Sequence, residues 1–142
     1  DLNEYEKARQ VLEELREQFP DNPEVANSLG YFLAEKGIDL DLAYDLIEEA
    51  LKSDPGVGAY LDSMGWVLYQ QGKNDDAFDY MIQAVNAIPD DPVLLEHLGM
   101  ILLKAGQVKE AEEMLRRALI LGGDKERLEN QLNNLPEGEG GN

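Results

Sequence analysis

The sequence predicts an all-α fold, an α-solenoid of antiparallel helix pairs with about 3.5 repeats and a C-terminal capping helix. Apolar residues recur at helical spacing along most of the chain, and no stretch alternates regularly between apolar and polar residues as a strand would. An apolar run with an internal glycine recurs at 35 and then 34 residues, marked by Gly30, Gly65 and Gly99. Such a period is typical of repeat arrays in which each unit packs on the next.

The predicted helices follow one another through short turns. They are expected at residues 1–19, 24–36, 40–53, 57–71, 74–87, 93–105, 108–121 and 124–135. Pro20, Pro55 and Pro89 separate successive helix pairs, because proline cannot continue a helix. Gly37, Gly72 and Gly106 end the first helix of each pair, since glycine adopts the left-handed C-cap conformation at low cost.

These elements divide one solenoid domain, residues 1–135, into repeats. Residues 1–20 form a half repeat, residues 21–55, 56–89 and 90–123 form full repeats, and residues 124–135 form the cap. Leu128, Leu132 and Leu135 are expected to face inward, and Glu126, Arg127, Glu129 and Asn130 outward. The Gly-rich tail, residues 136–142, is expected to be disordered. The first full repeat has one extra residue after Gly37, which predicts a slightly longer turn.

Other positions repeat in phase with the glycines. Alanines stand at 43, 77 and 111 and again at 50, 84 and 118, while Ile47, Met81 and Leu115 share one large apolar position. Small residues let paired helices approach closely, and large ones fill the space beside them. The best copy of the full pattern is Leu61-x2-Met64-Gly65-x2-Leu68, followed by Ala77-x3-Met81 and Pro89.

This pattern resembles the tetratricopeptide repeat, whose period is about 34 residues. The resemblance covers roughly residues 1–121 and implies a right-handed superhelix. No repeat has tryptophan at the first motif position, where Ala26, Leu61 and Leu95 stand, and Trp66 follows the glycine instead. The wording of the first two full repeats is most similar to bacterial tetratricopeptide proteins of the cell envelope. A periplasmic or envelope location follows from that narrower resemblance, with the cytoplasm as the alternative.

The resemblance also implies a concave groove lined by the first helix of each repeat. The matching candidate partner-binding residues are Asn27, Tyr31, Asp62, Trp66, Tyr69, Glu96, Met100 and Leu103. They predict an aromatic and apolar floor edged by acids, which suits a protein or peptide partner. In the alternative interpretation, Trp66 and Tyr69 are half-buried packing residues between repeats.

The charge of the chain narrows the class of partner. With 30 acidic and 12 basic residues the formal net charge is -18, which disfavours nucleic acid because phosphate binding depends on Lys and Arg. Some family members bind acidic C-terminal peptides through Lys, Asn and Arg in the groove. Only Asn27 is suitable among the matching positions here, so a basic or apolar segment is the better expectation. No apolar run is long enough to insert into a membrane.

No catalytic residue, cofactor or metal is expected. The chain lacks cysteine and has a single histidine, His97, which is expected to pack between helices or lie on the surface. Ser28 and Ser63 occupy the same repeat position as His97 and are not its partners in a triad. Adjacent acid pairs such as Glu48-Glu49 do not face one another on a helix and belong to solvated surfaces.

The leading interpretation is a non-enzymatic scaffold or adaptor that binds a partner segment in the groove. An alternative is a structural oligomerisation module that uses helix flanks and the ends of the array. The first helix lacks a pairing helix before it, so Val11 and Leu2 are expected to be exposed. This predicts a longer array upstream, or a homo-oligomer through the N-terminal half repeat. The narrower resemblance adds a third reading, a carrier or modulator of an envelope enzyme such as a protease.

Overall fold

The computed structural model describes residues 1–137 and contains eight helices in that range. They are α1 (Leu2–Gln18), α2 (Pro23–Lys36), α3 (Leu40–Ser53), α4 (Gly58–Gln70), α5 (Asn74–Ala87), α6 (Pro92–Lys104), α7 (Val108–Ile120) and α8 (Lys125–Asn133). Each begins and ends within a residue or two of its predicted bounds. The described residues contain no strand, which confirms the all-α fold. The expected disorder of the tail concerns mostly residues 138–142, which lie outside the described range.

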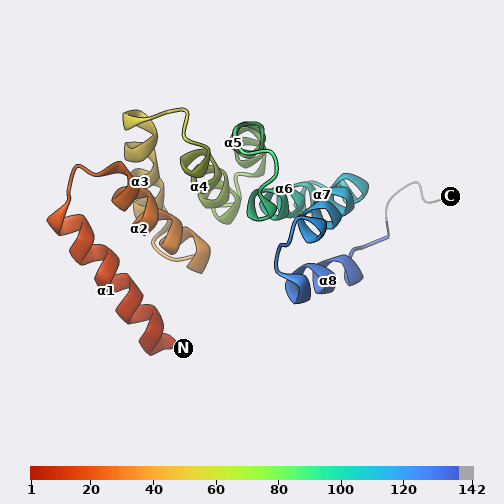
Figure 1. Cartoon of the computed structure of the whole chain (residues 1–142), viewed down its shortest axis with the longest axis horizontal. Helices are drawn as coiled ribbons and strands as arrows, with labels where there is room; N and C mark the ends of the chain where they lie inside the picture. The colour runs from red at the N-terminus through yellow and green to blue at the C-terminus, as the bar shows by residue number, and fades with distance from the viewer. Residues whose placement is uncertain (138–142) are drawn as a thin grey trace.

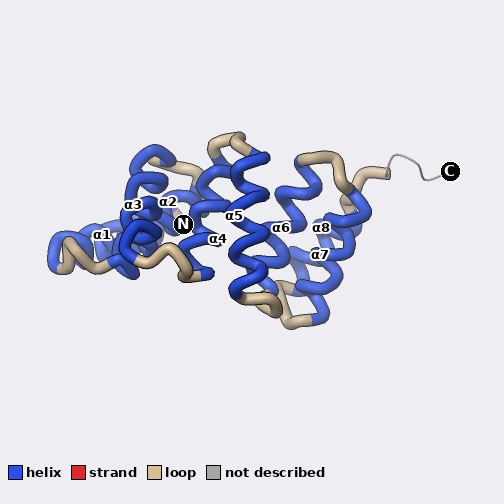
Figure 2. Tube along the Cα trace, turned by 90° about the horizontal axis from the view of Figure 1, so that it is seen from above, coloured by secondary structure: helices blue, strands red, loops and turns tan. Residues whose placement is uncertain are grey.

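The helices form a row of hairpins that progresses from one end of the molecule to the other (Figure 1). α2 packs on α3, α4 on α5 and α6 on α7, and the first helices α2, α4 and α6 also contact one another in sequence. α1 and α8 lie toward opposite ends of this row, as the second view also shows (Figure 2). The arrangement is a solenoid in which each helix contacts only near neighbours along the chain.

The repeated glycines lie where the two helices of a hairpin touch. Gly30 lies against Ile47, Gly65 against Met81 and Gly99 against Leu115, all of them buried. A methyl group added at any of the three would come within 3.0 Å of that neighbouring side chain. The recurring spacing of small and large residues along the chain therefore corresponds to close helix pairing in the structure.

The helix ends use the caps that the sequence predicts. Gly37, Gly72 and Gly106 have φ of 71°, 81° and 80°, the left-handed region in which glycine is unstrained. The expected longer turn in the first full repeat is wrong, because three residues separate the two helices in each full repeat. The extra residue instead follows Gly37, and α2 extends to the residue before that glycine. This arrangement leaves Asp39 with φ of 45°, and the Asp39 carboxylate accepts a 2.8 Å hydrogen bond from Arg9 of α1.

Burial is greatest in the middle of the row. α4 and α6 bury most of their residues, whereas α1 buries none. Leu2 and Val11 of α1 are 77% and 56% exposed, as the sequence predicts for a second helix without its first. None of the helices in the described range combines the length and the apolar run needed to cross a bilayer.

Candidate partner-binding groove

An open hollow of about 420 Å³ lies where the first helices α2, α4 and α6 meet. Its lining residues include three of the predicted site residues, Asn27, Tyr31 and Asp62. Exposed Ile88 and Val93 supply apolar surface, and Asp91 is the second carboxylate at the hollow. No lysine or arginine is among the described residues that line it.

The carboxylate of Asp62 is buried beside the hollow and paired with His97. Asp62 on α4 is only 6% exposed and His97 on α6 only 8%. His97 Nδ1 lies 2.7 Å from Asp62 Oδ1. Because an ionised carboxylate only accepts hydrogen bonds, the Nδ1–H group is the donor in this pair. The pair connects two adjacent first helices through their side chains. Asp62 therefore lines the hollow as a buried carboxylate paired with His97, and not as an exposed acid at the groove edge.

Three aromatic rings stack in a row from α4 to α6. The rings of Trp66 and Tyr69 are 4.7 Å apart and inclined by 16°, and those of Trp66 and His97 are 4.1 Å apart and inclined by 18°. Trp66 and Tyr69 are half-buried and pack on the hydrophobic core with one side. The rings therefore pack between helices, as the alternative interpretation expects, and they still expose surface. Partner binding by these rings stays a prediction.

The electrostatic environment on this side of the molecule is negative. Tyr31 is half-buried, and its ring centroid lies 6.3 Å from that of His97. Burial raises the pKa of Tyr31, and the negative charges of Asp62, Glu35 and Glu96 raise it further against the opposing charge of Arg127. Ionised tyrosine is disfavoured here first because the side chain is buried and then because acids surround it.

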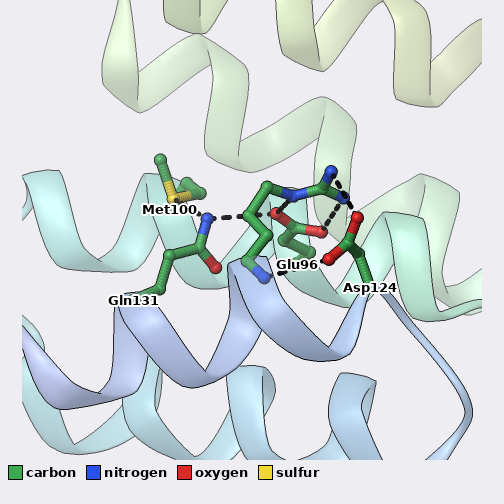
Figure 3. A network of polar contacts seen from close by, with 5 residues as sticks. Glu96, Met100, Asp124 and Gln131 are labelled. Carbon is green, nitrogen blue, oxygen red and sulfur yellow. Dashed lines mark hydrogen bonds and ion pairs between the residues drawn. The ribbon is translucent and has the colours of Figure 1, made fainter.

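Glu96 belongs to a separate polar network that joins α6 to α8 (Figure 3). Its side chain accepts two 2.7 Å hydrogen bonds from Arg127 and one of 3.0 Å from Gln131. Gln131 Nε2 also lies 3.4 Å from the sulfur of Met100. Burial acts to raise the pKa of Glu96, but the hydrogen bonds from Arg127 and Gln131 outweigh it and hold the pKa below its usual value.

Two predicted residues meet in this network. Glu96 is predicted at the groove edge, but it is only 7% exposed and is bound by α8. Arg127 is exposed, as predicted, and its guanidinium also reaches across to Glu96. The long arginine stem allows the head group to leave the face on which its Cα lies.

These contacts follow a spacing that is visible in the sequence, a separation of 35 residues. Asp62 and His97 are 35 residues apart, and so are Glu96 and Gln131, which is one residue more than the 34-residue repeat. Asp62 and Glu96 are equivalent repeat positions, and so are His97 and Gln131. Each acid therefore contacts a residue of the next repeat, one position after the residue that is equivalent to the acid itself. α8 binds α6 in the same way that α6 binds α4.

The structure thus divides the eight predicted site residues into groups. Asn27, Tyr31 and Asp62 line the hollow, and Trp66 and Tyr69 form the stacked row beside it. Glu96 and Met100 contact α8. Leu103 is half-buried against the core, and no described contact joins it to the hollow. His97, Arg127 and Gln131 are the residues of this surface that the predicted set lacks.

The comparisons with known protein sequences all identify the tetratricopeptide repeat. Residues 1–58 and residues 68–130 each match a sequence profile of the tetratricopeptide repeat, and together they cover most of the chain. A TPR repeat-containing protein of Pseudomonas aeruginosa is 46% identical over 80 residues. That match spans 56% of this chain but only 13% of the relative, so the chain corresponds to a small part of that protein.

Solved structures show the same fold. A thermophilic TPR protein of Thermus thermophilus superposes with a TM-score of 0.75 at 21% identity, over 94% of this chain and 74% of that one. MamA from Desulfovibrio magneticus superposes with a TM-score of 0.68 at 19% identity, over 84% of this chain and 67% of that one. At these identities the likeness concerns the fold alone.

Proposed function

Because the chain belongs to the tetratricopeptide repeat family, we propose that it is a non-catalytic interaction scaffold whose concave side binds a segment of a partner protein. Solenoids of this kind present extended surfaces rather than enclosed pockets. The observation that carries the proposal is the row of stacked rings, Tyr69, Trp66 and His97, beside an open hollow. Half-exposed aromatic side chains next to a concavity are the residues that most often dominate binding energy at protein interfaces.

The experiment is selection of short random peptides on the purified chain, followed by affinity measurement by fluorescence anisotropy. Exchange of both Trp66 and Tyr69 for alanine is expected to weaken the selected peptides by about tenfold or more, since central aromatic residues commonly contribute that much. The matched control is Tyr80→Ala, which removes a half-buried aromatic ring from the second helix α5. It should leave the affinity within about twofold.

Two results would contradict the proposal. One is failure of the selection to enrich any peptide on the wild-type chain. The other is unchanged affinity of the double variant when circular dichroism shows that it is still folded. Equal weakening by Tyr80→Ala would instead attribute the effect to lost stability, and the groove would no longer be needed to explain binding.

A second candidate function, oligomerisation through the array end, is favoured by one observation. α1 buries none of its residues, and Val11 of α1 and Phe19, which caps it, are exposed apolar side chains that a partner helix could cover. Sedimentation of the wild type against Val11→Asp separates this candidate from groove binding. A concentration-dependent dimer that the substitution dissociates supports oligomerisation, and a monomer at all concentrations contradicts it.

A further inference from the structure

We propose that the hollow between α2, α4 and α6 binds the ammonium group of a lysine side chain in the partner segment. This inference rests on the proposed function and specifies its chemistry. The hollow contains two carboxylates, Asp62 and Asp91, and no basic side chain among the described residues that line it. A cation that enters therefore meets negative charge without a competing internal partner.

Asp62 is the ionic group that this site offers. Its side chain is more than nine-tenths buried, and Oδ1 is occupied by His97 at 2.7 Å. The other oxygen, Oδ2, accepts no hydrogen bond from residues 1–137. Oδ2 is not among the buried polar atoms that lack a partner, so it reaches the open side of the hollow, where a further donor can approach it. Asp91 is less available, because its Oδ1 already caps α6 through Val93 and Leu94.

Neutral acceptors surround the same space. Oδ1 of Asn27 is buried without a hydrogen-bond partner among the described residues, and Asn27 lines the hollow. A half-turn of its amide would direct that oxygen toward a ligand. The hydroxyl groups of Ser28 and Tyr31 are further acceptors at the hollow. The negative environment that disfavours ionised Tyr31 is the same one that attracts a cation.

The arrangement favours lysine over arginine. Arginine binds carboxylates best through two parallel hydrogen bonds, which need both oxygens of one carboxylate. His97 already occupies one oxygen of Asp62, so that mode is unavailable. An ammonium group instead donates three separate hydrogen bonds and can use Asp62 Oδ2, Asn27 and a hydroxyl from different directions. The exposed side chains of Ile88 and Val93 provide apolar contact for the methylene stem.

The test uses n-butylammonium chloride, which reproduces the lysine side chain without a peptide. It is titrated into the isotope-labelled chain and followed by NMR. We expect saturable shifts confined to Asn27, Tyr31, Ile88 and Val93, and weaker binding of n-butylguanidinium. n-Butanol, which has the same stem without the charge, should bind about tenfold more weakly than the ammonium because it lacks the charge-assisted hydrogen bond.

Two substitutions should act in opposite directions. Asp62→Asn keeps an acceptor for His97 but removes the charge, and should weaken n-butylammonium about tenfold. Asn27→Asp adds a carboxylate to the hollow and should strengthen the binding of n-butylammonium. The control is Asp45→Asn, which makes the same chemical change at an exposed position of α3 and should have no effect beyond screening. Because gain and loss are both expected, poor folding of one variant does not remove the test.

Shifts that do not saturate, or that neither Asp62→Asn nor Asn27→Asp alters, would overturn the lysine site. Tighter binding of n-butylguanidinium would overturn the preference for lysine. These failures can be told apart from failure of the proposed function, which depends on Trp66 and Tyr69. If peptide binding requires those two residues but n-butylammonium does not bind in the hollow, the scaffold function stands and this inference fails.

Discussion

The three glycines at the helix contacts occupy the same repeat position, yet their surroundings differ in rigidity. A Cβ on Gly30 would lie 2.7 Å from Cγ1 of Ile47 and 3.0 Å from the carbonyl oxygen of Ala43. Ile47 is β-branched and fully buried, so it has little freedom to move away. At Gly65 the nearest atom is the terminal methyl of Met81 at 2.9 Å, the far end of a flexible side chain.

We therefore expect the two alanine substitutions to differ. Gly30→Ala should lower the free energy of unfolding by about 1–3 kcal/mol, because overpacking a rigid contact forces the helices apart. Gly65→Ala should change it by less than about 1 kcal/mol, since alanine is better than glycine in a helix by about that amount and Met81 can shift. Urea unfolding of both variants measures the difference. Equal losses would show that the helix pairs tolerate an added methyl alike.

For single residues, the sequence predicted the helix on which a side chain lies better than its burial and its hydrogen-bond partners. The repeat register correctly assigned Asp62 and Glu96 to the first helices, but it did not reveal that both are buried and paired. Their partners, His97 and Arg127, come from the next first helix, at separations of 35 and 31 residues. Aligning equivalent repeat positions does not reveal contacts between residues that occupy different repeat positions. The direction of a long side chain such as Arg127 is likewise set by its partner and not by helical spacing.

Among the helices, α8 shows how polar contacts can attach an element with little apolar surface. It fully buries a single residue, Leu128, packs Leu132 partly buried on the same cluster, and also contacts the array through the network around Glu96. The glutamate is almost fully buried while Arg127 remains half in solvent, so the ion pair is partly screened. The hydrogen bonds from Arg127 and Gln131 hold the pKa of Glu96 below its usual value despite burial, which acts to raise it.

This lowered pKa predicts a pH dependence of the attachment of α8. A carboxylate whose pKa is lower in the folded state contributes stability above its unfolded pKa of about 4.3, and that stability is lost as pH falls through the folded pKa. Glu96→Gln should therefore reduce stability by about 1 kcal/mol at neutral pH, and the difference from wild type should shrink below about pH 4. Urea unfolding measured across this pH range tests it.

The control for this experiment is Glu112→Gln. Glu112 forms an exposed pair with Arg116 one turn away on α7, and such pairs contribute little to stability. Its difference from wild type should be small at every pH. A pH-independent effect of Glu96→Gln would contradict the role assigned to the glutamate charge and would leave side-chain packing as the cause.

Across the whole molecule, the sequence predicted the array because its period is visible without any structure. Gly30, Gly65 and Gly99 fix the register, and proline and glycine fix the helix ends, so the eight helices follow directly. The hollow could not be predicted in this way. It depends on how closely α2, α4 and α6 approach one another, which small changes in side-chain volume decide.

The same neighbour-to-neighbour packing predicts how stability varies along the row. In a solenoid each unit is stabilised by the contacts on its two sides, so a unit at an end has fewer of them. α1 packs on α2, adds two partly exposed ion pairs, Arg9 with Asp39 and Arg16 with Glu49, and buries no residue. α4 by contrast is in contact with α2, α3, α5 and α6. Opening of α1 therefore exposes little apolar surface, while opening of α4 disrupts both halves of the core.

We expect amide hydrogen exchange to follow this order. Amides of α4 and α6 should exchange slowest, with protection close to the global free energy of unfolding, and those of α1 should exchange fastest among the helices because its opening is local. Peptide-resolved mass spectrometry of the whole chain measures both. Glu96→Gln should accelerate exchange in α8 while leaving α1 unchanged, since the two lie at opposite ends and share no contact. Uniform protection from α1 to α8 would instead mean that the row unfolds as one unit, and that α1 is stabilised by more than its contacts with α2.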